Sequence, residues 1–93
     1  MKYIFPAWML IIERVDRFSI DKKPINITMV SEKIQGNYSY VVKHIEFLEN
    51  EGIIVRKKIG KLVLLTLTIR GKKVAEAIKN IREVCEDGLV RKD

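Results

Sequence analysis

The sequence predicts a mainly α-helical fold with a single two-stranded β-hairpin, which places the chain in the α+β class. Apolar residues recur at helical spacing in four segments, and two runs of β-branched and aliphatic residues flank residues 59–61, Ile-Gly-Lys. The chain has 93 residues, two prolines and no low-complexity tract, so we expect one folded domain over residues 1–93. The predicted order is helix, helix, turn, helix, hairpin, helix.

The first predicted helix covers residues 6–18. Pro6 suits a first helical position, where its missing N–H costs nothing. The helix carries an apolar stripe that is wider than the core of one small domain needs. We therefore expect part of this stripe to face a second subunit, which would add buried surface to a short chain. The stripe consists of Trp8, Ile11, Ile12, Val15 and Phe18, with Met9 and Leu10 beside it.

A second, shorter helix is predicted over residues 29–35. Residues 25–27 favour a very short strand before it, and Thr28 has a side chain that suits the N-cap of the helix. The helix is expected to stop at Gly36, because glycine adopts the left-handed conformation of a C-cap at little cost.

The third predicted helix is capped by Asn37 or Ser39 and runs to about Asn50. Because the turn between the second and third helices is short and contains a glycine, the pair predicts a helix-turn-helix over about residues 28–51. Three apolar side chains, at spacings of four and three residues, are expected to face the core: Val41, Ile45 and Leu48.

The predicted hairpin carries most of the net positive charge. Its strands are expected over residues 53–58 and 62–68, with Gly60 supplying the positive φ that a tight turn needs. Residues 52–61 contribute +4 of the formal net charge of +6. Clustered cations release condensed counterions from DNA phosphates, so we expect contact with duplex DNA and keep a merely solvated turn as the alternative. The cations are Arg56, Lys57, Lys58 and Lys61.

The last predicted helix covers about residues 69–87, with Thr68 as its N-cap and a tail over residues 87–93 that is expected to fray. Its apolar residues keep the spacing of four and three that is typical of a helix packed along another helix. They are Val74, Ala77, Ile81 and Val84, with Ile78 and Cys85 on adjoining rows.

The first half of the third helix offers side chains that could read base edges. Groove-reading helices contact bases mainly with their N-terminal residues, and no acid occurs among residues 37–45, whereas three glutamates follow within residues 46–51. We expect His44 to be a half-buried packing residue, and Phe47 to pack under the hairpin or against the second helix. The candidates for DNA contact are Asn37, Tyr38, Ser39, Tyr40 and Lys43, with packing as an equal alternative for the two tyrosines.

Two motifs resemble those of a known family. Residues 38–54, YSYVVKHIEFLENEGII, match a recognition helix followed by Leu-Glu-x-x-Gly and a strand; residues 65–71, LTLTIRG, match Leu-Thr-x-x-Gly at the end of a wing. Over residues 8–85 the chain resembles the winged helix-turn-helix family, especially the small dimeric regulators of the MarR and PadR type, with a wing over about residues 53–67. The composition, rich in isoleucine and lysine, leans toward that of a thermophile, including archaeal ones.

The resemblance implies a homodimer that binds a palindromic DNA site, with N- and C-terminal dimerisation helices. Cys85 is by default a small buried hydrophobe, but an intersubunit disulfide stays open because thermophilic intracellular proteins form such bonds. The predicted interface residues are Trp8, Ile11, Ile12, Val15, Val74, Ile78, Ile81 and Cys85.

The function that we expect is sequence-specific binding of double-stranded DNA as a transcriptional regulator. A repressor is the simplest form, because a bare DNA-binding dimer blocks a promoter by occupying it. Two alternatives use the same fold: an architectural or plasmid-partition protein that coats DNA, and a winged-helix module that contacts other proteins.

Other classes of protein are not expected. One histidine and one cysteine assemble neither a catalytic triad nor a metal site, so we expect no enzyme, no metal and no cofactor. The longest apolar stretch is too short to span a bilayer and no signal peptide is recognisable, which favours a cytoplasmic protein without membrane contact. We expect no small-molecule effector, because the first and last helices show no convergent polar cluster in the sequence.

Overall fold

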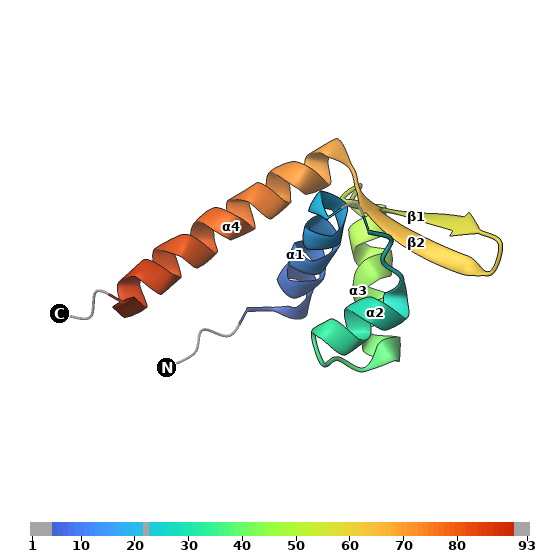
Figure 1. Cartoon of the computed structure of the whole chain (residues 1–93), viewed down its shortest axis with the longest axis horizontal. Coiled ribbons are helices and arrows are strands. Elements are labelled where there is room, and N and C mark those ends of the chain that lie inside the picture. Colours follow the sequence, from blue (N-terminus) through green and yellow to red (C-terminus); the bar gives the residue numbers. More distant parts are fainter. Residues whose placement is uncertain (1–4, 22, 91–93) are drawn as a thin grey trace.

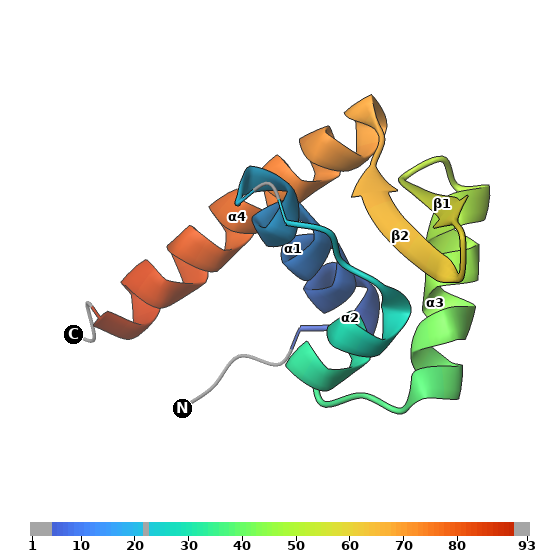
Figure 2. The same ribbon diagram turned by 45° about the vertical axis from the view of Figure 1, so that its right-hand side comes forward.

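The structure, a computed structural model, describes residues 5–21 and 23–90, and the side chains of these residues as far as Cys85. Three helices pack together beneath the start of a long fourth helix, the hairpin projects to one side, and the far end of the fourth helix extends to the other (Figures 1 and 2). The molecule is accordingly elongated, measuring 53 × 27 × 24 Å. The elements are α1 (Ala7–Ile20), α2 (Ile27–Lys33), α3 (Tyr38–Asn50), β1 (Ile54–Ile59), β2 (Leu62–Leu67) and α4 (Ile69–Val90), so the predicted order is confirmed.

The hydrophobic core lies where α1, α3 and the base of the hairpin meet. The three residues predicted to face inward from α3 are fully buried, as the spacing of four and three required. The first half of α4 also contributes to the core, through Ala75 and Ile78. The most deeply buried side chains are Ile11, Ile12, Val15, Ile25, Val30, Val41, Ile45, Leu48 and Ile54.

Two helices begin at residues other than those predicted. α1 starts at Ala7, so Pro6 is its N-cap and not its first residue. α2 is capped by Asn26, whose Oδ1 accepts a hydrogen bond of 2.8 Å from the Met29 N–H, and not by Thr28. The predicted strand over residues 25–27 is reduced to one isolated bridge between Asn26 and Leu64. Asn26 therefore both forms the bridge with Leu64 and caps α2.

The turn between α2 and α3 differs from the prediction by one residue. The left-handed conformation belongs to Gln35, with a φ of 55°, and not to Gly36. Gly36 is needed for a different reason: a Cβ there would lie 3.1 Å from Cγ2 of Val41, a contact tighter than side chains normally accept. The Gly36 N–H also donates to the Ser31 carbonyl at 2.9 Å. The glycine therefore lets the turn approach α3 closely.

The two strands pair in one antiparallel register from Ile54 opposite Leu67 to Ile59 opposite Leu62. Gly60 has the predicted positive φ, 60°, in a two-residue loop, and it is the first of the two loop residues, the pattern of a type II′ turn. The base of the hairpin is buried and its end is exposed. The hairpin is therefore anchored at one end only.

The joint between the hairpin and α4 is held by Thr68. Its Oγ1 accepts a hydrogen bond of 2.9 Å from the Gly71 N–H, which confirms the predicted cap, and donates one of 2.6 Å to the Gly52 carbonyl. α4 then continues to Val90, three residues beyond the predicted end. Of the tail that was expected to fray, residues 91–93 lie outside the described part of the chain.

α1 and α4 are joined by a partly buried ion pair. Arg82 donates to both carboxylate oxygens of Glu13, at 2.6 and 2.7 Å, and its guanidinium lies 4.5 Å from the ring centre of Phe5. Two parallel hydrogen bonds fix the direction of the arginine as well as its position. Among the described helices, none has the length and apolar character needed to cross a membrane.

Candidate nucleic-acid interface

The start of α3 is shaped by the Asn37 side chain. Its Oδ1 accepts hydrogen bonds from the N–H groups of Ser39, at 2.9 Å, and Tyr40, at 3.4 Å. The predicted cap is confirmed, but it occupies the side-chain oxygen of Asn37, which was also a candidate for DNA contact. Asn37 therefore positions the helix, and only its amide NH₂ group remains for a ligand.

The outer face of the first turns of α3 is open to solvent. Tyr38, Ser39, Tyr40 and Lys43 are all exposed. His44 is half-buried, as predicted, and the edge of its ring meets Tyr40 with the ring centres 4.4 Å apart. Both tyrosines thus keep an accessible surface, and packing against α2 or the hairpin does not cover them. The positive end of the helix dipole adds to the charge of Lys43 here.

Three lysines stand exposed on the hairpin: Lys57, Lys58 and Lys61. Within the described part of the chain, no carboxylate lies within ion-pair distance of them. Arg56, the fourth predicted cation, is different. Its Nη2 lies 2.8 Å from Oε1 of Glu49 and its Nε donates to the same oxygen at 3.0 Å. This hydrogen bond raises the pKa of Arg56 above its usual value, so the arginine stays charged but is already paired.

The two halves of the predicted site meet at one cleft. Tyr38 of α3, Lys61 and Leu62 of the hairpin, and Asn26 and Thr28 at the start of α2 border a hollow of about 270 Å³. The start of α3 and the cationic hairpin therefore lie side by side at this cleft. This juxtaposition follows from the bridge between Asn26 and Leu64, which holds the hairpin beside α2.

Comparison with solved structures decides the fold. AF1382 from Archaeoglobus fulgidus is 24% identical and superposes with a TM-score of 0.82 over 86% of this chain and 88% of that protein. MepR, a transcription regulator of the Staphylococcus aureus multidrug efflux pump MepA, gives 19% identity and a TM-score of 0.80 over 97% of this chain. A MarR family protein from Bacillus stearothermophilus gives 14% and 0.72 over 98%. The chain has a MarR-like winged-helix fold.

The likeness extends over nearly the whole chain but not over the whole of the larger proteins. This chain spans 66% of MepR and 62% of the Bacillus protein. No protein-family model matches the sequence, and no curated protein sequence is significantly similar to it. The predicted winged helix-turn-helix is therefore confirmed by the structure itself, with β1 and β2 as the wing.

Arg56 should matter less for DNA binding than its neighbours on the wing. Arg56→Ala should change the slope of binding affinity against salt by well under the 0.9 or so expected for one lost phosphate contact. Lys58→Ala is the matched control, because Lys58 lies two residues along the same strand face and is unpaired within the described chain. Fluorescence anisotropy with labelled duplex at several salt concentrations measures both slopes. Equal slopes for the two variants would contradict the paired state of Arg56.

Several predicted interface residues are corrected by the structure. Ile11, Ile12, Val15 and Ile78 are buried inside the protomer, so they have no surface left for a partner subunit. Helical spacing alone could not tell which side of α1 or of α4 packs inside the protomer and which side stays free, because both sides carry apolar residues. Of the predicted set, the residues that keep accessible or half-accessible surface are Trp8, Val74, Ile81 and Cys85.

An apolar hollow beside α3 was missed by sequence reasoning. Phe47 is exposed, packing neither under the wing nor against α2, and it borders a hollow with Trp8, Tyr40, Lys43 and His44. Trp8 belongs to α1 and comes near α3 only through the tertiary fold. The one available signal in the sequence was a phenylalanine on the predicted outer face of the third helix.

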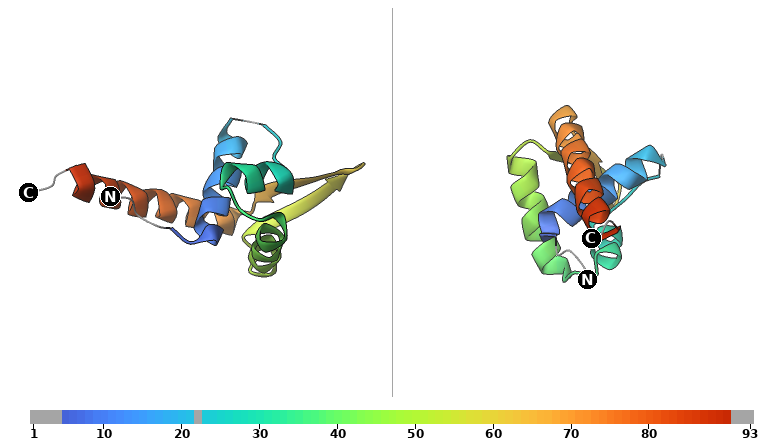
Figure 3. Two further views of the ribbon diagram at one scale, coloured as in Figure 1. Left: turned by 90° about the horizontal axis from the view of Figure 1, so that it is seen from below. Right: turned by 90° about the vertical axis from the view of Figure 1, so that its left-hand side faces the viewer.

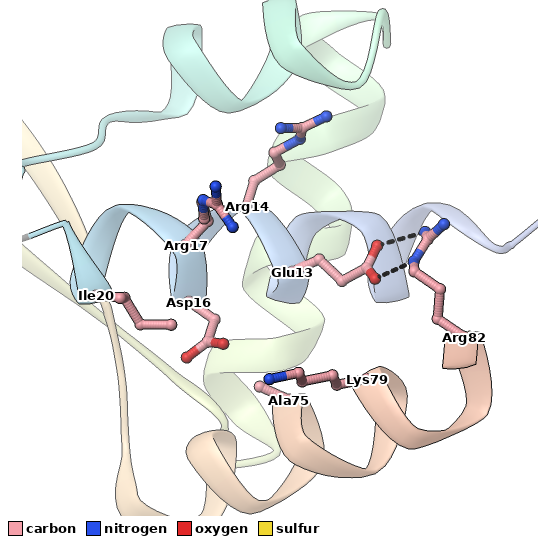
Figure 4. Close-up of a pocket in the computed structure, with 8 residues that line it drawn as sticks. All are labelled: Glu13, Arg14, Asp16, Arg17, Ile20, Ala75, Lys79 and Arg82. Atoms are coloured by element: carbon pink, nitrogen blue, oxygen red, sulfur yellow. Dashed lines mark hydrogen bonds and ion pairs between the residues drawn. The ribbon is translucent and has the colours of Figure 1, made fainter. Parts of the chain in front are cut away.

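A charged cleft between α1 and α4 was also missed. Figure 4 shows side chains from both helices converging on a cleft of about 380 Å³, contrary to the expectation of no convergent polar cluster. Its charges are mixed, and the Glu13–Arg82 pair closes one end. The charged side chains are Glu13, Arg14, Asp16, Arg17, Lys79 and Arg82. In the described residues, no cluster of three or more His, Cys, Asp or Glu could hold a metal ion.

Proposed function

We propose that the protein binds double-stranded DNA in a sequence-specific manner, as a homodimeric transcriptional regulator that represses by occupying its site. The cleft between Tyr38 at the start of α3 and Lys61 at the tip of the wing carries this proposal, because it places an acid-free helix start beside a hairpin that bears three exposed lysines. Side chains at the start of α3, Ser39 and Tyr40 above all, would read base edges. The wing would contact phosphates and fix the position of the helix.

Electrostatics supports DNA as that ligand. Lysines on a projecting hairpin release counterions from phosphates efficiently, because they approach the duplex without desolvating a buried charge. The acids of α3 lie in its second half, and one of them, Glu49, is neutralised by Arg56. The DNA-facing surface is therefore more positive than the helix sequence alone suggests.

The homodimer would form along the far half of α4. The far half of this helix extends past α1 and away from the rest of the protomer (Figures 1 and 3). Ala77, Ile81 and Val84 follow the spacing of four and three, and Ile81 and Val84 are 47% and 72% exposed. Two such helices packed around a two-fold axis would place two copies of α3 on one side of a duplex, about 34 Å apart.

Acidic residues on this seam should dissociate the dimer. Ile81→Glu combined with Val84→Glu places four carboxylates across a two-fold interface, and each protomer should still fold because both side chains are exposed in it. Sedimentation equilibrium should give the mass of a monomer, about 10.8 kDa, in place of a dimer. Ile69→Glu is the control, since Ile69 is exposed on the same helix but outside the seam. A double variant that remains dimeric would rule this interface out.

Selection of bound duplexes from a random-sequence pool tests the proposed function. A regulator should enrich a site with two-fold symmetry and half-sites about one helical turn apart. Enrichment without sequence preference, together with cooperative coating of long duplexes, would favour the architectural role. Absence of any DNA binding at low salt would contradict the proposal and leave a protein-contact module. Because a transcriptional regulator acts on DNA inside the cell, the proposed function also places the protein in the cytoplasm.

A further inference from the structure

The end of the wing carries two apolar side chains that neither the core nor phosphate binding requires. Ile59 and Leu62 face each other directly across the strands, on either side of the two-residue turn, and are 52% and 54% exposed. Residues beside tight turns are commonly polar. The hairpin makes its buried contacts nearer the base, through Ile54, Leu65 and Leu67. The exposed pair is therefore free to contact a partner.

The surroundings of this pair restrict the partner. Lys58 precedes it, Lys61 lies within the turn, and Lys57 shares its face of the hairpin; all three are exposed. An apolar tip ringed by cations fits a surface whose apolar interior lies between two lines of negative charge. Duplex DNA has this character at its minor groove, through which a side chain can reach the apolar faces of stacked bases between two phosphate backbones.

We propose that Ile59 and Leu62 form a wedge that enters the minor groove, opens the stack between two adjacent base pairs and bends the bound DNA. This inference rests on the proposed DNA binding and goes beyond it, because the lysines alone would position the duplex without deforming it. Isoleucine and leucine are among the side chains that proteins insert between base steps, kinking the duplex toward the major groove.

The wing has the stiffness that a wedge needs. Six residue pairs run without interruption from Ile54–Leu67 to Ile59–Leu62, and the type II′ turn at Gly60 closes the strands tightly. The Asn26–Leu64 bridge braces one strand against the body of the protein. A force at the tip is thereby carried to the core. Specificity follows as well: pyrimidine–purine steps unstack most easily, so the wedge favours a site that has such a step under the wing.

The test is DNA bending by Ile59→Thr/Leu62→Thr, a double change that removes the apolar wedge and places threonine, a residue that favours strands, at both positions. Val55→Thr is the matched control, because Val55 is 46% exposed on the same face of the wing but lies near its base. The probe is the duplex most enriched in the selection, labelled at both ends for energy transfer. Wild type and Val55→Thr should bend it by roughly 20° or more, whereas the double variant should bind and leave it straight.

A second readout uses the sequence beneath the wing. Replacing a TA step there by a stiff A-tract should weaken binding of the wild type and leave binding of the double variant unchanged. Circular dichroism and thermal unfolding establish that the variants are folded. If the double variant does not fold, the single change Leu62→Thr replaces it in the test and should reduce the bend.

Three results would overturn the wedge. Equal bending by wild type and the double variant would assign the bend to the lysines and leave the DNA-binding function intact. No binding of the wild type to any duplex would remove the proposed function and the wedge together. Binding to vesicles of phosphatidylserine and phosphatidylcholine that depends on Ile59 and Leu62, without DNA bending, would assign the tip to a lipid surface.

Discussion

Replacing Lys57, Lys58 and Lys61 together by alanine should lower the affinity for duplex DNA by about 100-fold at roughly 100 mM salt. All three side chains are exposed and unpaired within the described chain, so the change should leave the fold intact. Each lost phosphate contact should also make the slope of log affinity against log salt less negative by about 0.9. The loss should affect every DNA sequence alike, because phosphate contacts carry no sequence information.

A matched control separates the effect of where the lysines lie from the effect of the protein's net charge. Lys72, Lys73 and Lys79 are exposed on α4, and replacing them by alanine removes the same three charges far from the tip of the wing. This variant should retain most of the affinity and most of the salt dependence. Titrations followed by fluorescence anisotropy compare the two variants directly. If both lose affinity equally, the overall charge attracts DNA and the wing has no special role.

Gly71→Ala should destabilise the fold by more than about 3 kcal/mol, although alanine favours helices over glycine. A Cβ at Gly71 would overlap the carbonyl oxygen of Ile53, a backbone atom that cannot move without displacing the start of the wing. The Gly71 N–H is also bound to the Thr68 cap. The change should therefore push α4 away from the wing at their common joint.

Gly60→Ala is the control for this substitution. It has the same effect on the unfolded chain, but among the described residues, apart from its two chain neighbours, no heavy atom lies within 4 Å of a Cβ at Gly60. Only its positive φ opposes alanine, at a cost of about 1 to 2 kcal/mol. Chemical denaturation measures both free energies of unfolding. A Gly71→Ala variant as stable as wild type would show that the joint between α4 and the wing is looser than the structure indicates.

Local signals explain which parts of the fold could be predicted. The inward row of Val41, Ile45 and Leu48 and the turn at Gly60 depend on spacing and on the φ of one residue, and both are confirmed. The cap of α2 was assigned to the wrong residue because the bridge of Asn26 to Leu64 is a long-range contact. The role of Gly36 was misread because close packing and positive φ both select glycine.

The charged residues of the candidate site could be predicted from the sequence, but the contacts between residues of different elements could not. The exposed lysines of the wing follow from strand composition, whereas the pairing of Arg56 with Glu49 needs the angle between α3 and β1. The hollow at Trp8 and the cleft around Glu13 and Arg82 each combine residues of two helices. Such sites depend on helix packing, which single-helix periodicity does not contain.

The dependence of wild-type DNA affinity on salt tests the central claim most directly. A dimer that contacts phosphates through Lys43 and the three wing lysines of each protomer should show a slope of about −7 for log affinity against log salt. Measured on a selected duplex from low to moderate salt, a steep negative slope of that order is the predicted result. A slope near zero, or no binding at the lowest salt, would contradict DNA recognition by α3 and the wing.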